Sequence, residues 1–137
     1  MEKLLVNYAT QTYAILRIVV GFLFFCHGLQ KVFGLFGGVN GAGAPAPLLS
    51  LFGVAGLIEI IGGFLVVLGL FTGTVAFILS GHMAAAYFIG HFPASFWPIE
   101  NKGEEAVFYC FIFLYMATQG PGIWSLDAAR QRPARGY

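Results

Sequence analysis

Long apolar stretches broken by glycine and proline make up most of the chain. A helix needs about 20 such residues to cross the hydrocarbon core of a bilayer. The stretches show no strict alternation of apolar and polar residues, and they are too long for the strands of a membrane barrel. The pattern therefore predicts an all-α fold, a bundle of four transmembrane helices in which neighbours along the chain are antiparallel. The predicted helices, all in one membrane domain covering residues 1–137, span about 13–36, 48–70, 73–90 and 104–119.

The composition of the chain excludes a soluble globular protein. Hydrophobic residues make up 58% of the 137 residues and charged residues only 9%, whereas about a quarter of a soluble domain is charged. Glu59 is the only charged residue between Val32 and Ile99. Four spans and their turns use nearly the whole chain, so no room remains for a separate soluble catalytic domain. The net charge of +1 gives no indication of a nucleic-acid partner, and we expect none.

The distribution of lysine and arginine predicts the orientation in the membrane. Four spans put both termini on one side, while the other side carries only Lys31 and Lys102. Because cytoplasmic segments are enriched in Lys and Arg, we expect a multi-pass plasma-membrane protein with cytoplasmic N and C termini. Arg17 lies about one turn inside this face, where it would snorkel to the surface or pair two helices. The basic tail, 127–137, is expected to rest on anionic lipid headgroups; the basic residues assigned to this side are Lys3, Arg130, Arg132 and Arg135.

Glu59 is the most unusual polar residue, because it lies in the middle of the second predicted helix. An ionisable group at this depth is costly and usually faces the interior of a bundle or a watery cavity. Gly62 and Gly63 follow three and four residues later, so a neighbouring helix can approach the same face closely. Its carboxylate would accept protons beside a redox or transport site, or it would pair with a Lys, Arg or His of another helix.

Two histidines lie within the predicted spans. His27 shares a helix face with Lys31 at spacing i, i+4, and Gln30 flanks them. His82 lies near the middle of the third helix, whereas His91 is expected nearer the surface. Either His27 or His82 would pair with Glu59, bond a quinone carbonyl, ligate haem or a metal, or play a purely structural part.

The fourth helix opens with two carboxylates. Glu104 is explained by the favourable interaction of an acidic group with the positive end of a helix. Glu105 has Tyr109 at i+4 and is expected to look into the bundle. Together the four helices predict a polar pocket that opens outward. We assign Glu59 and Glu105 as catalytic, proton-exchanging groups and assign no metal site; the ligand-binding candidates are His27, Gln30, Lys31, His82 and Tyr109.

The two cysteines, Cys26 and Cys110, lie 84 positions apart in apolar surroundings. They form neither a Cys-x-x-Cys redox motif nor a metal-ligand spacing. Their alternatives are small packing residues or a thiol pair between helices.

Several motifs resemble the DoxX family of small four-helix membrane proteins. They are R-I-V-V-G-F-L-F-F-C-H-G-L-Q-K from Arg17, G-L-I-E-I-I-G-G from Gly56, and N-K-G-E-E-A-V-F-Y-C from Asn101, with G-P-G-I-W-S-L-D from Gly120 closing the pattern. The resemblance covers nearly the whole chain. The motif positions that carry over are Arg17, His27, Lys31, Glu59, Asn101 and Glu104 or Glu105. The family usually reads Asn-Gly-Gly-Glu at the last motif, so Lys102 stands where a glycine is expected.

The resemblance implies a membrane subunit associated with quinone-linked oxidation of sulfur compounds, or with enzymes that handle thiols and oxidative stress. Our leading hypothesis is therefore a quinone-linked redox subunit, an oxidoreductase component whose pocket binds a quinone headgroup. Haem, held by His27 and His82, is the second cofactor considered. A soluble redox or sulfur-handling enzyme and a second copy of the chain are the partners considered besides lipid. The alternatives are a transporter or binding protein for a small solute or ion, and a membrane scaffold for a soluble enzyme.

Overall fold

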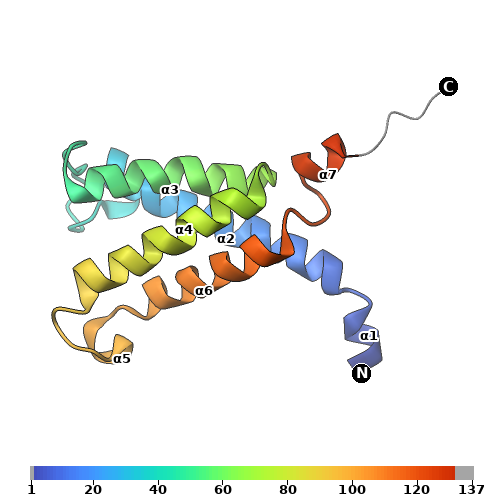
Figure 1. Cartoon of the computed structure of the whole chain (residues 1–137). Helices are drawn as coiled ribbons and strands as arrows, with labels where there is room; N and C mark the ends of the chain where they lie inside the picture. Colours follow the sequence, from blue (N-terminus) through green and yellow to red (C-terminus); the bar gives the residue numbers. More distant parts are fainter. Residues whose placement is uncertain (1, 132–137) are drawn as a thin grey trace. The chain divides into compact units, whose positions relative to one another are not determined.

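The computed structural model describes residues 2–131, and all regular structure within this range is helical (Figure 1). The all-α prediction is thereby confirmed, while the tail residues Arg132 and Arg135 lie outside the described residues. A 3-10 turn at Leu35–Gly37 and a π-helical turn at Tyr87–His91 follow α2 and α4. The helices are α1 (Glu2–Val6), α2 (Ala9–Phe33), α3 (Leu51–Leu68), α4 (Thr72–Ala86), α5 (Pro98–Asn101), α6 (Glu104–Gln119) and α7 (Leu126–Arg130).

Three helical segments of the described chain are long and apolar enough to cross a membrane. They are α2, α3 and the continuous segment Thr72–His91. Three of the four predicted spans therefore have the length and composition of transmembrane helices. Helix α6 has 16 residues, which is about 24 Å of rise against a hydrocarbon core of about 30 Å. A fourth span at α6 stays a prediction, as does the side on which the termini lie.

Capping residues and backbone conformation define the helix ends more closely than hydropathy does. Helix α2 begins at Ala9, four residues before the predicted start, because its polar first turns carry no hydrophobic signal. It ends at Phe33, and Gly34, the next residue, has a left-handed φ of 70°. Helix α3 begins after Ser50, whose side chain accepts a hydrogen bond of 3.1 Å from the amide of Gly53. It ends at Leu68, and the next residue, Gly69, is again in the left-handed region with φ 66°.

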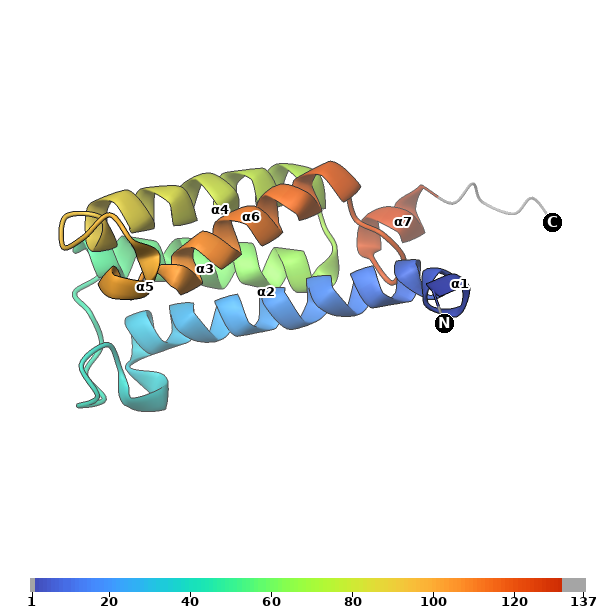
Figure 2. The ribbon, with the colours of Figure 1, turned by 90° about the horizontal axis from the view of Figure 1, so that it is seen from below.

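The chain forms two structural units, which we describe separately. The first contains α1, α2, α3 and the segment from Pro121 that carries α7. Within it, α2 and α3 are antiparallel and run side by side (Figure 2). A Cβ atom added to Gly28 would lie 2.6 Å from the carbonyl oxygen of Gly56, and one added to Gly63 would lie 2.6 Å from the amide of Phe25. The two backbones thus touch through glycine, as is common where helices pack in membranes.

The second unit spans Gly73–Gly120 and pairs α4 with α6. These helices are also antiparallel, since Gly73 lies near Ala117 and the Ser80 hydroxyl lies 3.6 Å from the thiol sulfur of Cys110. Both cysteines of the chain are free thiols in the structure, which favours the interpretation as packing residues. The order of contacts places the α4–α6 connection, with its π-helical turn and α5, at one end of this unit.

Candidate functional site

Lys31 and Glu59 form an ion pair between α2 and α3. The Lys31 Nζ donates a hydrogen bond to Oε1 of Glu59. Glu59 is the ninth of 18 residues in α3 and only 3% exposed, whereas the Lys31 side chain is 20% exposed. This is one of the pairings that the sequence left open for Glu59. The structure therefore joins two of the predicted site residues directly.

Glycine makes this pairing feasible. Gly56 lies one turn before Glu59, and a Cβ atom added to it would meet the Cβ of Lys31 at 2.9 Å. The missing side chain lets the lysine stem lie against the α3 backbone and direct its ammonium toward the carboxylate. Removing one member of a buried pair leaves an uncompensated charge, which typically costs about 3–5 kcal/mol. The site is therefore coupled to the stability of the helix pair.

The loop between α2 and α3 folds back on the lysine end of α2. The amide of Ala46 donates a 2.8 Å hydrogen bond to the carbonyl oxygen of Lys31. Gly34 and Gly38 allow the loop to approach itself, since a Cβ at Gly38 would lie 2.7 Å from the carbonyl oxygen of Ala44. Lys31 is thus held at its backbone by the loop and at its ammonium by α3.

The other predicted residues of α2 lie next to this pair along the helix. His27 is half-buried one turn before Lys31, on the same face of α2. Gln30 is also half-buried, and its backbone carbonyl accepts a 3.1 Å hydrogen bond from the amide of Gly34. The first unit therefore carries His27, Gln30, Lys31 and Glu59 in one neighbourhood.

The remaining predicted residues belong to the second unit. His82 is half-buried on α4, and Tyr109 is half-buried on α6 with its ring stacked on Phe113 at a centroid distance of 5.8 Å. Glu105 is exposed in the first turn of α6, beside the equally exposed Glu104. Convergence of all seven residues on one pocket stays a prediction.

Asn101 organises the connection between α4 and α6. Its side-chain nitrogen donates to the carbonyl oxygen of Ser95 at 2.7 Å and to the hydroxyl of Tyr87 at 3.2 Å. Its side-chain oxygen accepts a 2.7 Å hydrogen bond from the amide of Gly103. His91, expected at the surface, is half-buried, with its Nδ1 3.1 Å from the carbonyl oxygen of Asn101. Lys102 has a left-handed φ of 59°, the conformation that a glycine would adopt without strain.

Arg17 has a structural role that was one of its two predicted alternatives. Its side chain is fully buried. Nη1 donates to the carbonyl oxygens of Val66 and Val67 at 2.6 and 2.7 Å. Nη2 donates to the carbonyl oxygen of Trp124 at 2.7 Å and, at the longer distance of 3.4 Å, to that of Ile123. The snorkelling alternative is therefore wrong, because burial keeps the guanidinium from the surface, and the helix-pairing alternative is confirmed.

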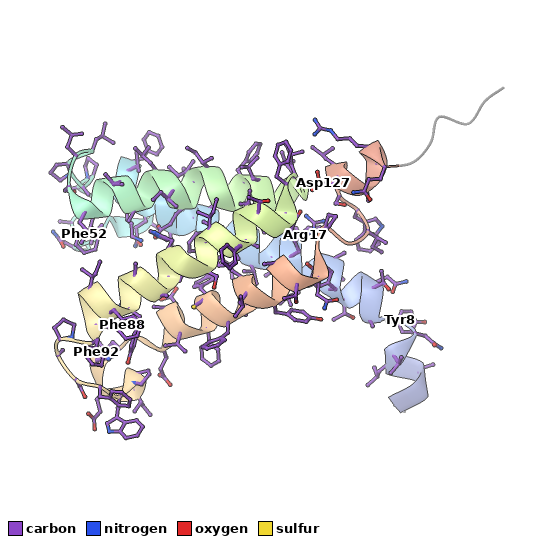
Figure 3. The ribbon with its side chains drawn as sticks, in the orientation of Figure 1. Tyr8, Arg17, Phe52, Phe88, Phe92 and Asp127 are labelled. Atoms are coloured by element: carbon purple, nitrogen blue, oxygen red, sulfur yellow. The ribbon has the colours of Figure 1, made fainter. Side chains whose placement is uncertain are left out.

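Asp127 completes this arrangement from the C-terminal side, and Figure 3 labels it together with Arg17. Its Oδ2 accepts a 3.2 Å hydrogen bond from the amide of Thr72, and its own amide donates to the carbonyl oxygen of Gly69 at 3.1 Å. A Cβ atom added to Gly69 would lie 2.9 Å from Nη1 of Arg17. Arg17 and Asp127 together hold the segment 121–131 on the turn that follows α3. We call this arrangement the C-terminal clasp.

Comparison with known proteins decides the family. A sequence model of the DoxX family matches residues 12–92, which include Arg17 and the Lys31–Glu59 pair. The chain belongs to the DoxX family. A protein of Haemophilus influenzae described as uncharacterized is 45% identical over 121 residues, covering 83% of this chain and 87% of its own. The inner membrane protein YphA of Escherichia coli is 31% identical over 124 residues, covering 82% and 86%. No solved structure matches the chain.

The motif residues of this DoxX protein have three separate positions in the fold. Arg17 belongs to the C-terminal clasp, Lys31 and Glu59 form the ion pair between α2 and α3, and Asn101 ties the connection before α6. Only the ion pair combines a buried acid with a partly exposed base, so it is the strongest candidate for chemistry.

Proposed function

We propose that this DoxX-family protein is a quinone-linked redox subunit of the plasma membrane, with the Lys31–Glu59 pair at its ligand site. The supporting observation is the pair itself, in which Lys31 of α2 contacts Glu59 in the middle of α3. Intramembrane ionisable residues mark ligand, ion or proton paths more often than packing roles. A small membrane-soluble ligand with carbonyl oxygens would suit such a site.

The residues present fit a quinone headgroup. The Lys31 ammonium has three donors, of which one is directed at Glu59, and the 20% exposure of its side chain leaves it accessible to a ligand carbonyl. His27, about 6 Å along the same helix face, supplies a second donor. A bound quinone would act as the electron acceptor. Lys31 would orient the headgroup through a hydrogen bond to its carbonyl. Glu59, which is a carboxylate in the ion pair, would take up one proton and pass it to the headgroup as two electrons reduce it, and the second proton would come from water.

The rest of the predicted pocket belongs to the same proposal. Glu105 would exchange protons with water because it is exposed, and His82 and Tyr109 stay predicted ligand-binding residues. Electrons would come from a soluble redox or sulfur-handling partner enzyme. Helix α6 would form a fourth span, and both termini would face the cytoplasm. An absorption spectrum of the purified protein tests the haem alternative, in which His27 and His82 would serve as axial ligands.

A binding experiment with the full chain in nanodiscs tests the proposal. Lys31→Met combined with Glu59→Leu replaces the ion pair by apolar residues of similar size, a change that is often neutral for stability. We expect this variant to keep the thermal stability of the parent and to bind a short-chain quinone analogue at least tenfold more weakly. His27→Ala should weaken binding less. Lys102→Met, which removes an exposed lysine of the second unit, is the matched control.

Unchanged quinone binding in the double variant would contradict the proposal. The second candidate function, a conduit for a small solute or ion, draws on the central position of Glu59 in α3. Proteoliposome flux that disappears in the double variant, in a protein that binds no quinone analogue, would favour this conduit instead.

A further inference from the structure

Four exposed residues lie next to the C-terminal clasp along the chain. Phe71 and Trp124 are each 60% exposed, Leu126 is 44% exposed, and Arg130 is also exposed. The guanidinium carbon of Arg130 lies 5.9 Å from the centroid of the Phe71 ring. All four belong to the first unit, on the turn after α3 or on the segment that the clasp holds against it. We call these residues the aromatic–arginine patch.

Both aromatic residues of this patch have unusual backbone conformations. Phe71 has φ 52° and Trp124 has φ 54°, a region that bulky L-residues rarely adopt. The clasp maintains them there, because Arg17 binds the carbonyl of Trp124 and Asp127 binds the amide of Thr72, next to Phe71. Strain of this kind persists only where the surrounding structure enforces it, and it often coincides with a functional surface. Here the enforced conformation leaves two large aromatic rings exposed.

The position of the patch relative to the membrane follows from helix length. Helix α3 has 18 residues, about 27 Å of rise, which nearly matches the hydrocarbon core. Phe71 comes three residues after its end, at the boundary between hydrocarbon and headgroups. Aromatic rings are favoured at this depth. An arginine positioned over an aromatic face still has N–H groups free to bind the oxygens of a phosphate.

We propose that the aromatic–arginine patch is a docking surface for anionic phospholipid headgroups. Phe71, Trp124 and Leu126 enter the headgroup boundary, and Arg130 binds the lipid phosphate. Two further arginines follow at positions 132 and 135 of the sequence, so the charge of the region complements an anionic leaflet. Because the clasp fixes the patch to α2 and α3, lipid docking sets the depth of this helix pair in the bilayer. This inference does not depend on the proposed quinone site.

Tryptophan fluorescence tests the inference. The chain has two tryptophans, so Trp97→Phe leaves Trp124 as a single probe in the full-length protein. This protein is placed in phosphatidylcholine vesicles with or without phosphatidylglycerol, and quenching by lipids brominated near the headgroup is compared with quenching by lipids brominated at the chain end. We expect stronger quenching near the headgroup, and a blue shift of emission with phosphatidylglycerol that high salt reverses.

Charge variants then distinguish the patch from the tail. Arg130→Gln should remove more than half of the phosphatidylglycerol-dependent shift, whereas Lys102→Gln, an exposed cation of the second unit, should leave it intact. Three results would overturn the inference. One is an emission spectrum that does not respond to phosphatidylglycerol. Another is loss of the response with Arg132→Gln and Arg135→Gln but not with Arg130→Gln. The third is a Trp124 that no brominated lipid quenches, which would mean that protein covers the patch.

Discussion

Replacing Arg17 by methionine should loosen the first unit at one end. The substitution keeps a long side chain but removes the donors to Val66, Val67 and Trp124, which are bound at 2.6, 2.7 and 2.7 Å. Side-chain hydrogen bonds in membrane proteins contribute about 0.6–1.7 kcal/mol each, and bonds from charged donors lie at the upper end. Three such bonds amount to about 3–5 kcal/mol. Because a buried cation is also removed, part of this is regained, and we expect a net loss of about 2–3 kcal/mol.

Two further variants serve as comparisons for Arg17→Met. Arg17→Lys retains the charge but has no planar fork with which to bridge α3 and the segment before α7, so it should lose about half as much stability. Arg130→Met removes an arginine that is exposed and should change stability by less than about 0.5 kcal/mol. The free energy of unfolding is measured by denaturation of the protein in mixed micelles. Trypsin digestion after Arg130 provides a second readout, since release of the clasp should accelerate that cleavage.

The refuting outcome for Arg17 is specific. A methionine variant that is as stable as the parent, or more stable, would mean that desolvation of the guanidinium cancels its hydrogen bonds. An unchanged rate of cleavage at Arg130 in a destabilised Arg17→Met variant would mean that Arg17 does not hold the C-terminal segment. The first result would contradict the expected contribution of Arg17 to stability, and the second would contradict its role in holding the C-terminal segment.

Three further substitutions follow from the packing. Gly28→Ala puts a methyl group against the α3 backbone and should lower the free energy of unfolding by about 1–3 kcal/mol. Its control is Gly81→Ala, which has open space around it and should be neutral or stabilising when both variants are compared by thermal unfolding. Lys102→Gly relieves a left-handed conformation and should stabilise by about 0.5–1 kcal/mol, and no gain over Lys102→Ala would contradict this reason. Asn101→Ala removes three hydrogen bonds and should cost about 2–3 kcal/mol, with faster hydrogen exchange at the amide of Gly103; equal exchange would refute it.

The helical architecture was predictable because a bilayer imposes simple length and polarity requirements. Runs of apolar residues separated by glycine and proline located α2, α3 and α4 to within a few residues. The start of α2 at Ala9 was missed, because polar residues continue the helix beyond the apolar stretch. The π-helical turn at Tyr87–His91 was also missed. The local sequence has no pattern that predicts such a turn, and the contact of its last residue, His91, is with the carbonyl oxygen of Asn101 ten positions later.

The ion pair of the candidate site was predictable from its charges. Glu59 stands out because it is alone in a long apolar stretch, and Lys31 is among the few cations that could reach it. The partners of Arg17 could not be inferred, because they are backbone carbonyls 49 to 107 residues away that any sequence would supply. Side-chain identity reveals a buried cation, but the folded chain alone shows which carbonyls it binds.

The pairing of α2 with α3 has a mechanical consequence. Arg17 and Lys31 are 14 residues apart in sequence, about 21 Å along α2, and both bind groups of α3. A slide of one helix past the other by a single turn, about 5.4 Å, would break both attachments at once and drive glycine-lined backbones into side chains. These two attachments therefore fix the register of α2 against α3. An insertion of one residue between Arg17 and Lys31 should therefore be far more damaging than one in the loop that precedes α3.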